Sequence, residues 1–182
     1  LIDYLRNCIM DRFELERLIY AGERDFSGVD WSGASLYNLN LTGIILVDAN
    51  LTETDLQDVI FDSACLEGAC FERADLNGAR FQDANLRRAN FDNSTLYSVY
   101  FNRCNLDDAS LKGADLRKAS FQGTTLKRAN LEDILSDYIS FTDTDFTGAK
   151  ISISDVVDHR AVRVTLPSGE IYTLPRLEGE NL

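Results

Sequence analysis

Side chains that could perform chemistry are few in this chain of 182 residues. The single histidine is His159, near the C-terminal end, and the four cysteines are Cys8, Cys65, Cys70 and Cys104. A serine or cysteine nucleophile needs an activating base, and metal sites usually recruit imidazoles or paired thiolates. Because the chain has a single histidine and no Cys-x-x-Cys pair, we expect no catalytic, metal-ligating or cofactor-binding residues. The cysteines are then inert thiols, which is typical of a reducing, cytoplasmic compartment.

Other side chains of the chain are suited to binding another protein. Tyr97 and Tyr100 occupy positions where the repeating pattern described below mostly carries polar residues, and Arg80 stands four repeats before Tyr100. Tyrosine and arginine are enriched at protein interfaces. We therefore predict that Arg80, Tyr97 and Tyr100 form a partner-binding patch. The alternative interpretation is that they are ordinary surface residues, since single exposed apolar groups are common.

The charge of the chain narrows the class of partner. It has 30 acidic and 18 basic residues and a net charge of -12. Acidic surfaces repel phosphate, so direct nucleic-acid binding is not expected. No apolar run approaches the roughly 20 residues that span a bilayer, so membrane insertion is not expected either. An acidic band from Asp48 to Asp75 is followed by a basic band from Arg80 to Arg128, which favours a solvated surface of mixed sign.

The elements that position these side chains follow from a repeat of five residues. From Phe26 to Ile151, every fifth residue is large and apolar at 25 of 26 positions, and Ser136 is the exception. We call this position the centre. The residue two before it, the small position, is alanine in 13 repeats, and the residue two after it, the corner position, is Gly, Asn or Asp in 16. A period of five fits neither helix nor strand, so the chain must turn every five residues.

Stacking of like residues indicates how many five-residue segments make one complete coil of the column. Centres that are four repeats apart form uniform series, whereas centres that are three repeats apart mix Phe with Leu. One series is Phe61, Phe81, Phe101, Phe121 and Phe141, and another is Leu56, Leu76, Leu96 and Leu116. Like residues stack without leaving voids. We therefore predict a four-sided column of stacked coils, each made of four repeats, with these residues as its structural core.

The repeat unit resembles that of a known family. Its units read small residue, Asp or Asn, Leu or Phe, and two free positions, as in Ala74-Asp75-Leu76-Asn77-Gly78 and Ala84-Asn85-Leu86-Arg87-Arg88. This pattern resembles the pentapeptide-repeat proteins over residues 24–153, and residues 21–28 resemble the start of cyanobacterial members. The resemblance implies an all-β solenoid, a right-handed quadrilateral parallel β-helix of about 6.5 coils.

Both ends of such a column need covering, because they expose apolar interior and unpaired backbone. At the N-terminal end, residues 1–22 are predicted as a helical cap. Its helix runs from about Arg12 to Ala21, after a capping box of Asp11 and Glu14, and stops at Gly22. The repeat domain is then residues 23–153.

Residues 154–182 are predicted as a C-terminal hairpin and tail cap. Its strands, residues 161–166 and 171–174, flank the turn Pro167-Ser168-Gly169, with Val162, Val164 and Leu166 on one face. The break in the repeat at Ser136 predicts a local bulge that turns Leu135 inward, because a buried hydroxyl without a partner is costly.

The function predicted from these features is that of a non-catalytic, rigid scaffold for an unidentified protein partner, as a monomer or weak dimer. Some members of the resembled family imitate B-form DNA and bind DNA gyrase, so the resemblance implies a type II topoisomerase ligand as the alternative. The basic band interrupts the negative surface that this alternative needs. An enzyme is the least favoured class, since an interior filled by Leu and Phe leaves no cleft.

Overall fold

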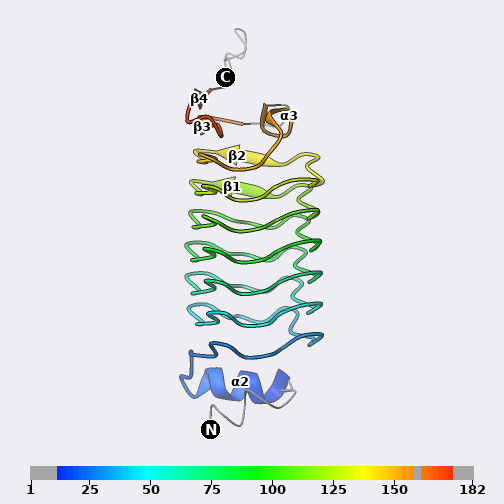
Figure 1. The fold of residues 1–182 in the computed structure, drawn as a ribbon. Helices are drawn as coiled ribbons and strands as arrows, with labels where there is room; N and C mark the ends of the chain where they lie inside the picture. Colours follow the sequence, from blue (N-terminus) through cyan, green and yellow to red (C-terminus); the bar gives the residue numbers. More distant parts are fainter. Residues whose placement is uncertain (1–11, 158–160, 174–182) are drawn as a thin grey trace, which may run out of the picture.

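The chain folds into a straight column of stacked coils (Figure 1). This computed structural model describes residues 12–157 and 161–173. Cys8, Asp11 and His159 lie outside the described residues, as do residues 1–11 of the predicted N-terminal cap and residues 174–182 of the tail.

Parallel backbone pairing between residues four repeats apart holds the coils together. Bridges of this spacing begin with Asp25 opposite Ile45 and include Asn130 opposite Lys150. Where the pairing is longest, strands β1 (Ser120–Gln122) and β2 (Ser140–Thr142) run parallel, with Phe121 opposite Phe141. The prediction of a parallel β-helix with four repeats in each coil is confirmed by this register.

Each corner of the column is a tight turn with one residue in the left-handed region. Every corner position from Gly28 to Gly148 has a positive φ, and most of these residues are not glycine. Within the turn, the carbonyl of a centre such as Phe61 accepts a hydrogen bond from the N–H three residues later, here Ala64, at 3.1 Å. This is the arrangement of a type II turn. Left-handed backbone costs a residue with a β-carbon roughly 1–2 kcal/mol. The backbone hydrogen bonds between coils, which we call the ladder, therefore outweigh the conformational preference of the non-glycine residues at these corners.

The interior is filled by the centres and the small residues. Rings of the phenylalanine series stack from one coil to the next with centroids 5.0–5.3 Å apart. A second stack, Phe71 on Phe91 at 4.7 Å, meets the first edge to face. All the residues of the predicted core are buried: Phe61, Phe81, Phe101, Phe121, Phe141, Leu56, Leu76, Leu96 and Leu116.

The prediction of a bulge that turns Leu135 inward is wrong. Leu135 stays in register opposite Asp115 and its side chain is 52% exposed. Ser136 keeps the centre position, half-buried, and its hydroxyl donates to Asp155 Oδ1 at 3.1 Å. Asp155 belongs to a short helix, α3 (Ile153–Val157), which the sequence pattern did not predict. The hydroxyl therefore has its acceptor, while Leu135 keeps its backbone hydrogen bonds to Ala114 and Leu116 in the preceding coil.

At the C-terminal end a short hairpin continues the column. Strand β3 (Val164–Thr165) pairs antiparallel with β4 (Ile171–Tyr172), while Thr165 also bridges to Asp145 in the coil below. Ala161 and Val164 are buried, but Val162 is half-exposed, so the prediction that Val162 and Val164 share one face is wrong. The physical reason is that Ala161 keeps the five-residue phase of the centres, which places the next residue outside.

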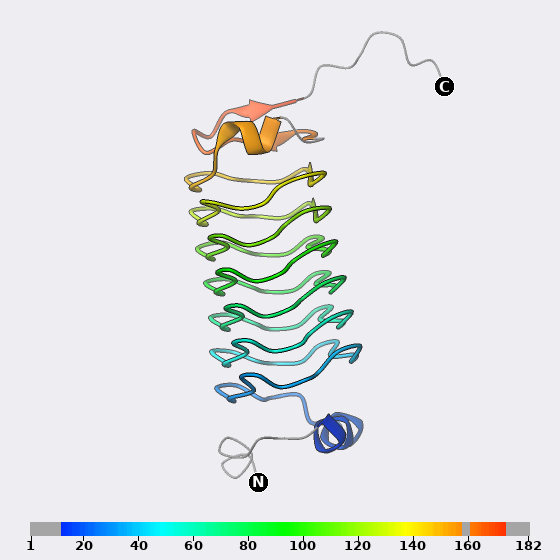
Figure 2. The same cartoon turned by 90° about the vertical axis from the view of Figure 1, so that its right-hand side faces the viewer.

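At the N-terminal end, helix α2 (Arg12–Tyr20) lies across the first coil (Figures 1 and 2). Leu15 and Leu18 are buried and belong to the same core cluster as Trp31. After α2, Glu23 N–H donates to the carbonyl of Leu18, and Gly22 has a φ of 95°. This pattern is a Schellman stop, as predicted from Gly22.

Candidate interaction surface

The structure places two of the three predicted patch residues side by side. Arg80 and Tyr100 are bridged neighbours in successive coils, and Phe81 N–H donates to the carbonyl of Tyr100 at 2.8 Å. Tyr100 is 48% exposed. The guanidinium of Arg80 is held by Asp62 through Nε–Oδ1 and Nη2–Oδ2 contacts of 3.1 and 2.5 Å. Hydrogen bonding by Asp62 raises the pKa of Arg80.

Tyr97 lies just across the corner from Tyr100 and is covered by cations of the next coil. Lys118 Nζ stands 4.9 Å from the centroid of its ring, and the guanidinium carbon of Arg117 stands 5.9 Å from it. A cation over an aromatic face is worth about 0.5–1 kcal/mol at an exposed site. Arg117 is also hydrogen-bonded to Asp115, whereas Lys118 has no ion-pair partner among the described residues.

Two exposed apolar residues near this corner were not predicted as part of the patch. Tyr138 is 82% exposed, and Leu135 is 52% exposed. Lys118 N–H donates to the carbonyl of Asp137 at 2.9 Å, so Tyr138 lies at the same corner as Lys118, one coil further along. Their outward phase in the repeat is the signal that could have found them. We call the set Arg80, Tyr97, Tyr100, Lys118, Leu135 and Tyr138 the tyrosine patch.

Elsewhere, many surface charges neutralise one another between coils. Corner positions of successive coils form the ion pairs Asp83–Arg103, Asp108–Arg128 and Asp143–Arg163. Hydrogen bonds from the guanidinium groups lower the pKa of Asp83 and of Asp108. Most cations of the basic band are therefore paired with carboxylates.

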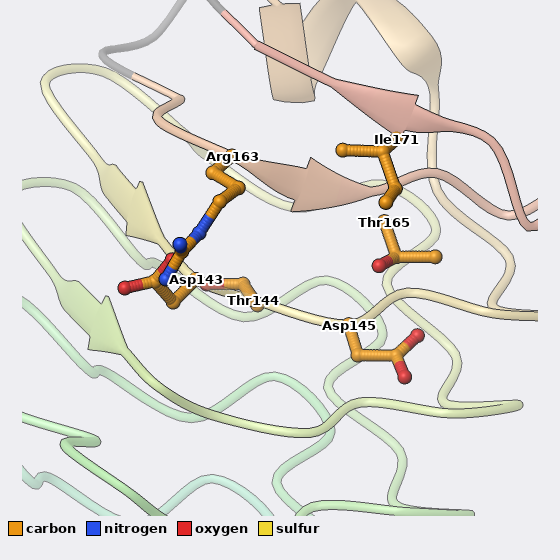
Figure 3. Close-up of a pocket in the computed structure, with 6 residues that line it drawn as sticks. All are labelled: Asp143, Thr144, Asp145, Arg163, Thr165 and Ile171. Carbon is orange, nitrogen blue, oxygen red and sulfur yellow. The ribbon is translucent and has the colours of Figure 1, made fainter.

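Two hollows lie near the C-terminal end of the column. The one in Figure 3 has a volume of about 280 Å³ and is lined by Asp143, Thr144, Asp145, Arg163, Thr165 and Ile171. Arg163 is paired there with Asp143, and the Thr144 hydroxyl donates to the carbonyl of Phe121 at 2.7 Å. Arg163 and Asp143 neutralise each other, and no base among the described residues activates the Thr144 hydroxyl, which donates to a backbone carbonyl.

The second hollow, of about 400 Å³, is lined by Leu131, Glu132, Asp133, Lys150, Ile151, Ser152 and Asp155. Its Ser152 hydroxyl bonds to that of Ser154 at 2.7 Å, and Asp155 accepts from Ser136. Within the described part of the chain, no group of three or more His, Cys, Asp or Glu side chains is placed to hold a metal ion.

The thiols differ in their surroundings. Cys104 fills a small position and is buried, and this burial raises the pKa of its thiol to about 12. Cys65 and Cys70 are free, half-buried thiols on the outside of the column. Since the thiolate is the reactive form, Cys104 is unsuited to nucleophilic chemistry.

Two family models match the chain. The model described as "Pentapeptide repeat region" matches residues 54–131, and that described as "Pentapeptide repeats (8 copies)" matches residues 23–52 and 34–73. Together these matches run without a gap from residue 23 to residue 131. A search of curated proteins found no match.

Solved structures with a similar chain include two pentapeptide-repeat proteins and a fluoroquinolone resistance protein. HetL, involved in heterocyst differentiation regulation in the cyanobacterium Nostoc sp. strain PCC 7120, is 21% identical, with 90% of this chain and 100% of that chain covered and a TM-score of 0.43. A protein of the Arabidopsis thaliana thylakoid lumen is 30% identical, with 54% and 66% covered and a TM-score of 0.45. QnrB1, a plasmid-mediated fluoroquinolone resistance protein, is 22% identical, with 77% and 81% covered and a TM-score of 0.38.

Neither α2 nor α3 has the length and apolar character that a bilayer-spanning helix requires.

Proposed function

The chain belongs to the pentapeptide-repeat family, and from this premise we propose that it is a non-catalytic, rigid scaffold whose outer surface binds a protein partner. In this proposal residues 23–153 form the repeat column. Residues 1–22 and 154–182 cover its two ends, which keeps columns from joining through exposed backbone.

The observation that carries the proposal is the filled interior. Stacked rings such as Phe81 and Phe101, with centroids 5.0 Å apart, occupy the axis of the column and are fully buried. Small-molecule sites are concave pockets with a few convergent polar groups. Since the axis holds only packed side chains, recognition is left to the outer faces.

The tyrosine patch is the part of that outer surface best suited to a partner. Tyr100, Leu135 and Tyr138 together expose apolar area in a region where most outward residues are polar. Burying such area contributes roughly 25 cal/mol per Å². Lys118, which has no carboxylate partner among the described residues, adds a charge that an acidic group of the partner can meet.

Affinity capture from the source lysate tests this proposal. The bait is compared with the double variant Tyr97→Ser/Tyr138→Ser and with Tyr37→Ser, whose tyrosine is exposed in the same outward series as Tyr97, three coils earlier. We expect at least one protein, identified by mass spectrometry, to be lost with the double variant and kept with Tyr37→Ser. Capture that is equal for all three baits would contradict the assignment of the patch.

The topoisomerase ligand remains the competing function. It requires a near-continuous negative face, and the inter-coil pairs Asp83–Arg103 and Asp108–Arg128 interrupt such a face here. A supercoiling assay with purified gyrase distinguishes the two functions. Inhibition by micromolar protein would favour the ligand over the scaffold.

We place the scaffold in the cytoplasm, without direct nucleic-acid binding. The three described cysteines, Cys65, Cys70 and Cys104, are all free thiols, which is usual in a reducing compartment. Fractionation of source cells with an antibody to the chain tests this placement, and recovery in an oxidising compartment would contradict it.

A further inference from the structure

Helix α2 presents two different faces. Leu15 and Leu18 point into the column and are buried. The exposed residues on the opposite side are Phe13, Glu16, Arg17 and Tyr20. Their spacing of i, i+3, i+4 and i+7 puts all four on one stripe of the helix. The stripe has an aromatic ring at each end and an opposite-charge pair in the middle.

The exposure of the two rings is unusually large. Phe13 is 79% exposed and Tyr20 is 95% exposed. A helical stripe with this spacing is the kind of surface that packs against another helix or a groove. The cap function of α2 uses only the buried side, so it does not account for the outward rings.

We propose that the occupant of this stripe is α2 of a second copy of the chain, packed antiparallel about a twofold axis. The axis passes between Glu16 and Arg17. In that arrangement Phe13 faces the partner's Tyr20, and Glu16 faces the partner's Arg17. The twofold operator repeats both contacts, so the surface is complementary to itself, as an isologous dimer requires.

The charges select this orientation. Two helices packed in parallel would place Glu16 beside the same residue of the partner, and like charges in contact are destabilising. Within α2, Glu16 pairs with Arg12 and Arg17 pairs with Glu14, yet the side chains of Glu16 and Arg17 are still 45% and 69% exposed. Both groups can therefore add a contact to the partner.

The position of α2 determines the shape of such a dimer. The helix lies across the N-terminal end of the column in Figure 1 and is viewed along its axis in Figure 2. Two copies joined through it meet end to end, so the dimer is an elongated particle. Four exposed residues on each side form a contact below the size of a standard interface, so the dimer is weak and depends on concentration.

Sedimentation velocity and small-angle scattering of the full chain test the proposal, from about 10 µM to about 1 mM protein. We expect the mean mass to rise towards that of a dimer and the maximum dimension to approach twice the monomer value. The double variant Phe13→Ser/Tyr20→Ser should remain monomeric throughout. A wild-type chain that stays monomeric, or an equally dimeric double variant, would overturn the proposal.

A charge-reversal pair tests the antiparallel geometry. Glu16→Arg alone and Arg17→Glu alone each place like charges across the twofold axis, and each should weaken dimerisation about tenfold or more. Mixed in equal amounts, the two variants put opposite charges at both contacts and should form a heterodimer. Failure of the mixture to dimerise, with each variant shown to be folded by circular dichroism, would overturn this geometry.

Discussion

The carboxylate of Asp48 occupies the space beside Gly68, one coil further along the column, so that a β-carbon on Gly68 would overlap it. Both are corner positions, with φ of 53° and 70°. The same arrangement recurs at Gly78, beside Asp58, and at Gly113, beside Asn93. Glycine at these corners therefore makes room for the acidic or amide side chain of the preceding coil.

This relationship predicts that Gly68→Ala destabilises the column more than Gly123→Ala does. Both glycines have a positive φ, but a β-carbon at position 123 would stand 3.5 Å from Arg103 Cγ, an ordinary contact. The left-handed backbone lowers the free energy of unfolding of both variants by about 1 kcal/mol. Displacement of Asp48 adds roughly 0.5 kcal/mol to the loss in Gly68→Ala. Urea unfolding with unchanged m-values measures the difference, and equal midpoints would contradict the steric argument.

The stacked rings predict a large cost for Phe101→Ala. Phe101 is fully buried between Phe81 and Phe121, with centroids 5.0 and 5.1 Å away. Loss of a buried phenylalanine ring typically lowers the free energy of unfolding by about 3–5 kcal/mol. Tyr100→Ala, at the exposed neighbouring position, is the control and should change stability by about 0.5 kcal/mol or less. Similar losses for both variants would show that the ring stack is not what stabilises these coils.

The pairing of Asp115 with Arg117 predicts a loss of stability in acid. Hydrogen bonds from the Arg117 guanidinium lower the pKa of Asp115 in the folded state. Its stabilising effect is therefore complete above the unfolded pKa of about 3.9 and is lost as the pH falls through the lower folded value.

Thermal unfolding of wild type and Asp115→Asn between pH 7 and pH 2 measures this contribution. The wild-type chain should melt at the higher temperature at neutral pH, and the gap should close at the acidic end. A gap that stays constant over the whole range would show that the carboxylate charge is not its source.

The buried thiol predicts selective alkylation. With its pKa raised to about 12 by burial, Cys104 is almost entirely protonated at pH 8, and the thiolate is the species that reacts. Iodoacetamide should label the half-buried Cys65 and Cys70 first, as read by peptide mass spectrometry. In urea all three should react at similar rates. Early labelling of Cys104 in the folded chain would contradict its buried placement.

The proposed cap predicts a change in the only tryptophan of the chain. Trp31 is buried in the same core cluster as Leu15 and Leu18 of α2. The double variant Leu15→Ala/Leu18→Ala removes the apolar side of the helix, so Trp31 should become solvated and its fluorescence should shift to the red. Glu16→Ala, on the outward side, is the matched control. An unchanged spectrum in the double variant would show that α2 does not cover the first coil.

Much of the fold could be predicted from the sequence because every coil packs against a coil with nearly the same residue pattern. The centres from Phe26 to Phe146 carry the same chemistry in nearly every repeat, and each coil meets a neighbour of nearly identical pattern four repeats away. Inward and outward positions, corners and the phenylalanine series then follow from the period alone. The same phase indicated Tyr97 and Tyr100 as outward residues.

The tertiary structure alone decided what happens where the pattern breaks. Leu135 was expected to turn inward because a buried hydroxyl at Ser136 would be costly, yet its N–H and its carbonyl are both hydrogen-bonded to the preceding coil, at Ala114 and Leu116, and its side chain stays outside. The acceptor for Ser136 comes from α3, and the partner of Arg80 is Asp62 in the preceding coil. A periodic sequence determines whether each side chain lies inside or outside the column, because the backbone hydrogen bonds between coils repeat from one coil to the next. It does not determine which side chains of neighbouring coils meet, because those contacts depend on rotamers and on the irregular ends.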